Sequence, residues 1–176
     1  MTLSDLAALG SFVSGIAVLV SLIYLSLQIR QNTLAHRATA HKVRADFVME
    51  SLHQLGDPVL ASTFVRGAAG DRTLSEAEFT QFNAYMHAWF VGMSEIHWLH
   101  QRGMLDEDAF QGSIAALRAR LQSPGIRAEW SVVRPVMPEH FRVEVDRLMA
   151  EQAPAPPANR PFEQWKTALS ARPAGS

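Results

Sequence analysis

A stretch without any charged side chain, from Leu6 to Ile29, constrains this chain more than any other feature. A helix needs about 20 mainly apolar residues to cross the hydrocarbon core of a bilayer, and this stretch exceeds that length. Lipid offers no water to backbone N–H and C=O groups, so a segment buried there has to be helical. We therefore predict one transmembrane helix over residues 6–29 that ties a soluble domain to a membrane.

Two other kinds of segment compete with this prediction. A secretory signal peptide has a basic start and a shorter apolar core of roughly 7–15 residues before a small-residue cleavage site. Residues 1–5 contain no basic side chain, and the apolar stretch leads directly into the polar residues 30–33. A buried core helix seldom continues for this length without a charge. The sequence favours the membrane span over both alternatives.

Basic residues flank the predicted span on one side only. Arg30, Arg37, Lys42 and Arg44 follow it, whereas residues 1–5 contain neither Lys nor Arg. The positive-inside rule then places the N-terminus outside and the rest of the chain in the cytoplasm. The same four residues form a collar suited to anionic lipid headgroups. The chain has no cysteine, which fits a cytoplasmic domain without disulfides.

The first helix is predicted to run from near Ser4 to about Leu55, because residues 31–55 contain neither Gly nor Pro. A seam of residues spaced alternately three and four apart, the heptad pattern, follows this helix. Its members are Gly10, Val13, Ala17, Val20, Tyr24, Leu27, Gln31, Leu34, Ala38, His41, Ala45, Val48, Leu52 and Leu55. Beyond the membrane, we expect the seam to pack on the chain's own domain.

Small side chains in the predicted span would let a second membrane helix approach closely. They are Ala7, Gly10, Ser11, Ser14, Gly15 and Ala17. The alternative is that such residues are simply common in membrane spans, and the sequence does not separate the two interpretations.

Start and stop signals divide residues 56–152 into further helices. Gly56 is expected to end the first helix in the left-handed conformation, and Asp57 to cap a short helix to about Arg66 that Gly67 and Gly70 close. Ser75 and Glu78 form a capping box at the start of the main core helix, which ends at Gly103. That helix carries an apolar stripe at three-four spacing. The stripe comprises Phe79, Phe82, Met86, Trp89, Phe90, Met93, Ile96, His97 and His100.

Three more helices complete the predicted domain. One follows the N-cap Asp106 to about Leu121, and one covers residues 126–133 after a turn at 123–125. The last begins at Pro138, and its apolar face comprises Phe141, Val145, Leu148 and Met149. No segment alternates with period two, so no strand is predicted. The predicted fold class is all-α, with a transmembrane helix that continues into a helical bundle with an αα-hairpin core.

A Pro-rich linker separates this domain from the C-terminal tail. Phe162, Trp165 and Leu169 in the tail recur at i, i+3 and i+7, as in a helical peptide that docks in a partner's groove. The simpler interpretation, which we prefer here, is that the tail folds back on its own domain or frays. The predicted organisation is an external N-terminus (1–5), a span (6–29), a cytoplasmic domain (30–152) and a linker with tail (153–176).

Residues 21–33 (SLIYLSLQIRQNT) resemble the membrane-exit signature of an uncharacterised family of bacterial single-span proteins. Residues 89–95, residues 103–106, and residues 124–127 with Trp130 also resemble that family's pattern, and the likeness covers most of residues 3–150. The family has no established activity, so the resemblance implies topology and fold but no chemistry. It implies that the membrane is the bacterial inner membrane.

Histidines are the only reactive-looking side chains. His97 and His100 are three residues apart on one helix face, which is a spacing found in metal sites. If the main core helix runs antiparallel to the first helix, His36 comes level with them, and the three could bind a metal or haem or sense pH. The simpler interpretation, which we favour, is a set of half-buried polar residues at the wet end of a bundle.

Other chemistry finds no support in the sequence. Phosphate loops, nucleophile elbows, zincin motifs and di-iron motifs do not occur, and no cofactor is predicted. The net charge of −1, with acids and bases interspersed, gives no nucleic-acid footprint. We therefore expect a non-enzymatic accessory, assembly or scaffold subunit whose partners are the bilayer and other membrane subunits or a second copy. The alternative is a His-based metal- or haem-binding redox or sensor protein.

Overall fold

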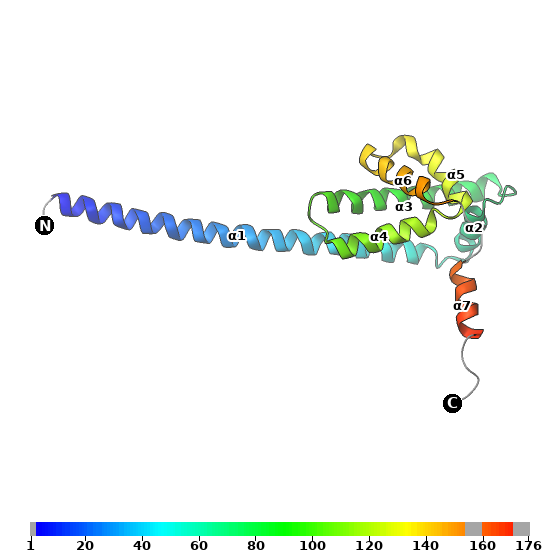
Figure 1. Cartoon of the computed structure of the whole chain (residues 1–176), viewed down its shortest axis with the longest axis horizontal. Coiled ribbons are helices and arrows are strands. Elements are labelled where there is room, and N and C mark those ends of the chain that lie inside the picture. Colours follow the sequence, from blue (N-terminus) through cyan, green and yellow to red (C-terminus); the bar gives the residue numbers. More distant parts are fainter. Residues whose placement is uncertain (1–2, 154–159, 171–176) are drawn as a thin grey trace, which may run out of the picture. The chain divides into compact units, whose positions relative to one another are not determined.

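A computed structural model describes residues 3–153 and 160–170 of the chain (Figure 1). Every regular element over these residues is helical, as predicted, and no strand occurs among them. The chain divides into two units, one ending at Lys42 and one beginning at Val43. The elements are α1 (Leu3–Gln54), α2 (Pro58–Ala69), α3 (Glu76–Gln101), α4 (Glu107–Arg120), α5 (Pro124–Val133), the 3-10 helix η1 (Arg134–Val136), α6 (Glu139–Glu151) and α7 (Arg160–Ser170).

α1 begins and ends within one residue of its predicted bounds. The chain leaves it through tight i→i−3 bonds: the N–H of Gly56 donates to the carbonyl of His53 (3.0 Å) and that of Asp57 to Gln54 (3.2 Å). Such bonds close a helix without a left-handed residue. The prediction of a left-handed Gly56 is therefore wrong; among the described glycines, only Gly70 and Gly103 have positive φ.

α2 is longer than predicted. Asp57 caps it as expected, because its carboxylate accepts a hydrogen bond from the N–H of Leu60 (2.8 Å). The helix then continues through Gly67 to Ala69 and ends at Gly70, the second of the two glycines predicted to close it, whose φ is +78°. Gly67 stays inside the helix because the ring of Phe82 covers its Cα, and a Cβ there would lie 2.5 Å from the ring. Gly67 therefore serves helix packing and does not terminate the helix.

α3 supplies much of the core of the second unit. The predicted capping box is present, with Ser75 Oγ accepting from the N–H of Glu78 (3.3 Å) and Glu78 Oε2 accepting from the N–H of Ser75 (2.7 Å). The stripe from Phe82 to His97 is buried, and Tyr85 joins it. Phe79 remains 42% exposed, so its predicted place in the core is wrong. It lies in the first turn of α3, where its neighbours leave it uncovered.

The last turns of α1 pack on α3 through a stripe one residue away from the predicted seam. The ring of Phe47 covers Gly92, and Tyr85 Oη lies 3.5 Å from the carbonyl of Ser51, so the two helices run antiparallel here. The seam residues Val48 and Leu52 are 40% and 60% exposed. The expectation that the seam packs on its own domain is therefore wrong for these residues. Gly92 explains why Phe47 faces α3, because any larger residue at position 92 would clash with the Phe47 ring.

The remaining helices close the core. Asp106 caps α4 as predicted, accepting from the N–H of Ala109 (2.8 Å). α5 begins at Pro124 instead of residue 126, because a proline suits the first helical position and residues 123–125 form the helix start and no separate turn. Three of the four residues predicted on one face of α6, Phe141, Val145 and Leu148, are completely buried, and the fourth, Met149, is partly buried against the core.

Candidate functional site

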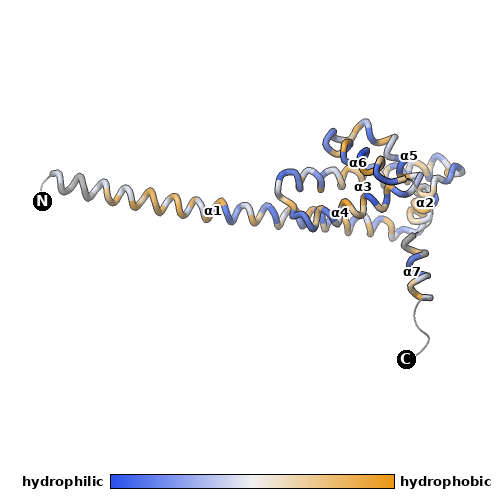
Figure 2. The backbone as a smooth tube through the Cα atoms, in the orientation of Figure 1, coloured by the Kyte–Doolittle hydropathy of each residue, from blue (hydrophilic) through white to orange (hydrophobic). Residues whose placement is uncertain are grey.

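The apolar part of α1 is exposed along its whole described length. Figure 2 shows a run of hydrophobic residues in α1 before its more polar C-terminal half. An 18-residue window of this helix has a mean hydropathy of 2.1, and none of it is buried. By length and composition the helix can cross a membrane, although signal sequences and buried core helices meet the same two criteria.

One hydroxyl group inside this segment and one just after it are satisfied by the helix itself. Ser21 Oγ donates to the carbonyl of Ala17 (2.8 Å), and Thr33 Oγ1 donates to that of Ile29 (2.9 Å). A hydroxyl that bonds four residues back needs no water. These side chains are therefore compatible with a hydrocarbon environment, where an unsatisfied polar group is costly.

The predicted small-residue face is open in the single chain. A Cβ added at Gly10 or Gly15 would meet nothing within 4 Å. The side chains of Ser11, Ser14 and Ala17 are also exposed, and that of Ala7 lies outside the described residues. The face has room for a second helix.

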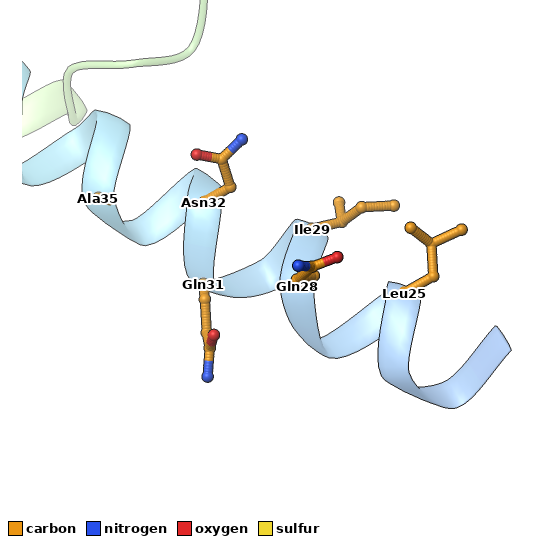
Figure 3. A pocket seen from close by; sticks show the side chains of 6 residues that line it. All are labelled: Leu25, Gln28, Ile29, Gln31, Asn32 and Ala35. Atoms are coloured by element: carbon orange, nitrogen blue, oxygen red, sulfur yellow. The ribbon is translucent and has the colours of Figure 1, made fainter. Parts of the chain in front are cut away.

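Figure 3 shows a shallow hollow along α1. Its six lining residues all belong to this helix. They are Leu25, Gln28, Ile29, Gln31, Asn32 and Ala35. The side chains of Gln31 and Asn32 point to different sides of the helix, so no opposing wall encloses a ligand. The hollow therefore lies along the surface of a single helix.

The four collar residues fall in different surroundings. Arg30, Arg37 and Lys42 are exposed in the first unit. Arg44 belongs to the second unit, where its Nε donates to Ser113 Oγ of α4 at 2.9 Å. Arg44 therefore joins α1 to α4, a role that its position in the sequence did not reveal.

The three candidate metal ligands have different neighbours. His36 is an exposed residue of the first unit. His100 stacks on Phe110, with ring centroids 3.7 Å apart, and its Nε2 lies 2.9 Å from Glu107 Oε2. The described residues contain no group of three or more His, Cys, Asp or Glu side chains placed to hold a metal ion.

His97 instead pairs with His140 of α6. Their rings are 5.3 Å apart and nearly parallel, at 16°. Lone pairs of ring nitrogens lie in the ring plane, so two stacked rings do not converge on one ion. His97 Nδ1 and His140 Nε2 are both buried without a hydrogen-bond partner.

The environment of His97 disfavours its charged form. Burial lowers the pKa of His97, and the neighbouring His140 and His100 lower it further, against an opposing effect of Glu144. A histidine held neutral in the fold but protonated in the unfolded chain makes folding pH-dependent. Above the unfolded-state pKa of about 6.5, His97 is neutral in both states and does not reduce the free energy of unfolding. As the pH falls below that value, His97 of the unfolded chain takes up a proton more readily than His97 of the folded domain, so the free energy of unfolding decreases.

We expect His97→Leu to flatten the acid side of the stability profile. Between pH 7.5 and 5.5 the parent protein should lose up to about 1.4 kcal/mol per pH unit from this group, and the variant should lose less. Denaturant titrations of both chains in mild detergent, followed by tryptophan fluorescence, measure the two slopes. Equal slopes would show that the His97–His140 contact carries no pH dependence.

Three polar side chains whose surroundings in the fold are unusual were not singled out from the sequence. The first is His140, which stacks on His97. Glu129 of α5 is 2% exposed and accepts from Asn83 Nδ2 at 2.5 Å, and burial raises its pKa against the effect of that amide. Arg120 of α4 lies over the ring of Trp89 at 4.5 Å and that of Phe64 at 5.2 Å. Each depends on a partner distant in sequence, so no local pattern could have revealed it.

The tail stripe is exposed on α7. Phe162, Trp165 and Leu169 expose 48%, 58% and 49% of their surfaces. The rings of Phe162 and Trp165 stack at 6.0 Å, and Lys166 Nζ lies 4.6 Å from the centre of the Phe162 ring. The stripe therefore forms one face of a helix.

No family model, curated protein or solved structure matches the chain. The fold and the exposed apolar helix define its class: an all-helical protein with one helix long and apolar enough to span a membrane.

Proposed function

We propose that this chain is a single-span membrane protein whose helical domain serves as an accessory, assembly or scaffold subunit of a membrane complex. The observation that carries the proposal is the exposed apolar segment of α1, which has no charged residue from Leu6 to Ile29 and no buried residue in its most apolar window. An exposed apolar surface of this extent is costly in water and favourable in lipid. The open small-residue face supports a packing partner within the membrane.

The charge distribution supports an orientation with the N-terminus outside and the domain in the cytoplasm. Arg30, Arg37 and Lys42 follow the span and suit the inner surface of a bacterial membrane. The resemblance of residues 21–33 to a bacterial single-span family supports the same placement. The chain has no cysteine, so single cysteines at Ser4 and Val136, both exposed, report the topology. An impermeant maleimide should label Ser4→Cys in intact cells and Val136→Cys only after lysis; the reverse pattern contradicts this orientation.

Purification in mild detergent followed by native mass measurement tests the subunit role. We expect the chain to appear with a second copy or with a co-purifying membrane protein. A clean monomer without any co-purifying protein would contradict the role as a subunit, while leaving the membrane span itself intact.

A charge in the middle of the span should reduce membrane integration. An Arg at the centre of a membrane helix costs about 2.5–3.5 kcal/mol on the insertion scale. Leu19→Arg should therefore lower the fraction of chain that resists alkaline extraction from membranes. Leu52→Arg is the matched control, because Leu52 is also an exposed leucine of α1 but lies beyond the predicted span. If both variants behave like the parent, residues 6–29 are not in lipid.

A further inference from the structure

α7 carries an apolar face that the core of the second unit does not use. The buried core cluster and the side chains packed against it come from α1 to α6 and the loops between them, and none comes from α7. Among the described residues, the face formed by Phe162, Trp165 and Leu169 takes no part in that core. Its large rings and its leucine lie on one side of a helix whose other positions are polar except for Pro161 and Ala168.

The charge of the tail identifies a partner for this face. Residues 160–172 contain three basic side chains, Arg160, Lys166 and Arg172, and one acidic side chain, Glu163, so their net charge is +2, while the whole chain carries −1. Lys166 adjoins the apolar face, with its ammonium group over the Phe162 ring. A long basic side chain beside an aromatic face can extend its charge to a headgroup while its methylenes stay in apolar surroundings.

We propose that α7 lies flat in the headgroup region of an anionic bilayer, with Phe162, Trp165 and Leu169 turned towards the acyl chains. Tryptophan and phenylalanine opposite a basic, polar face are typical of interfacial helices. Trp165 is suited to the boundary, because its ring has an apolar body and a polar N–H. The proposal rests on the proposed function, which places the second unit beside a membrane.

Because the span of α1 already attaches the chain to the membrane, a short interfacial helix is enough for a second contact. One weak membrane signal gives only marginal, reversible binding, and stable attachment takes two. The span of α1 provides the first signal, so α7 meets the bilayer at a high effective concentration instead of from bulk solution. The tail then binds reversibly, as a second contact of the domain with the membrane.

The test uses the full chain in lipid nanodiscs, with a nitroxide label on one introduced cysteine. Leu169→Cys places the label on the apolar face, and Gln164→Cys places it on the opposite side of α7 as the matched control. In discs of phosphatidylglycerol and phosphatidylcholine, we expect the ratio of oxygen to nickel-chelate collisions at position 169 to exceed that at position 164 several-fold. The difference should shrink in discs of phosphatidylcholine alone.

Two outcomes would overturn the proposal. Equal ratios at both positions would show that α7 does not enter the bilayer. A label at position 169 that is immobilised and shielded from both reagents would show that the face lies in a protein groove, either of this domain or of a second copy. Replacing Phe162 and Trp165 together by serine should abolish the difference between the two positions.

The same preparation separates this proposal from the span on which it rests. A label at Val20→Cys reports on α1 alone. If position 20 is lipid-exposed and position 169 is not, only the tail proposal fails. If position 20 is freely accessible to the nickel chelate, the proposed function fails as well.

Discussion

Gly125→Ala is expected to destabilise the helical domain by about 3 kcal/mol or more. A Cβ at this position would lie 1.7 Å from the carbonyl oxygen of Gly67 and 2.9 Å from the backbone nitrogen of Gly70. Both opposing atoms belong to the backbone of α2 and its C-cap, so no side-chain rotation relieves the clash and the helices have to separate. Overpacking usually costs about 1–3 kcal/mol, and a backbone contact this close belongs at or beyond the upper end.

Gly112→Ala is the matched control for this substitution. Gly112 also lies inside a helix, α4, but a Cβ there would meet only Arg44 Nη2, at an ordinary 3.5 Å. Alanine favours a helix interior over glycine by roughly 0.5–1 kcal/mol, so this variant should be unchanged or slightly more stable. Denaturant unfolding in mild detergent measures both. A Gly125→Ala variant as stable as Gly112→Ala would contradict the close approach of α2 and α5.

Phe90→Ala should cost about 3–5 kcal/mol, the usual range for removing a fully buried aromatic ring. Phe90 has no exposed surface, and its ring centroid lies 5.0 Å from that of Trp130 and 5.5 Å from that of Trp89. The truncation would leave a cavity between α3 and α5 that these rigid rings cannot fill. The expected loss is a large share of the roughly 5–15 kcal/mol that stabilises a typical domain.

Phe79→Ala makes the same chemical change on the same helix at an exposed position. Because Phe79 retains 42% of its surface, we expect a loss below about 1 kcal/mol. The comparison measures burial directly, since the residue type and the helix are held constant. Similar losses for the two variants would show that Phe79 belongs to the core after all.

Local signals predicted much of this fold. Asp57, Ser75 and Asp106 begin helices where their side chains accept backbone N–H groups, because capping depends on residues only three positions apart. The apolar stripe of α3 was likewise readable from its helical period, from Phe82 to His97. The length of α1 followed from the absence of helix-breaking residues between 31 and 55.

The errors concern contacts between distant parts of the chain. The sequence predicts that Gly67 and Gly70 together close α2; Gly70 does so, whereas the missing side chain of Gly67 makes room for Phe82 of another helix. The heptad seam is predicted to face the domain. Instead Phe47, one residue before the seam residue Val48, packs on Gly92, and Val48 stays exposed. Both outcomes depend on a second helix whose position no local pattern gives.

The candidate site was less predictable than the fold. The sequence singled out His97, but its partner His140 lies on α6 and contacts it only in the folded domain. Buried Glu129 looks in the sequence like any solvated carboxylate, and both its burial and its contact with Asn83 of α3 arise only in the folded domain. Side-chain chemistry that depends on tertiary neighbours therefore becomes visible only in the structure.

The membrane span can be tested by fractionating the full-length chain after detergent-free lysis and an alkaline wash. We predict that the protein stays in the membrane pellet and enters solution only with detergent. Recovery of a folded chain in the aqueous supernatant, with Val13 and Leu19 shielded from solvent inside a globular core, would contradict it.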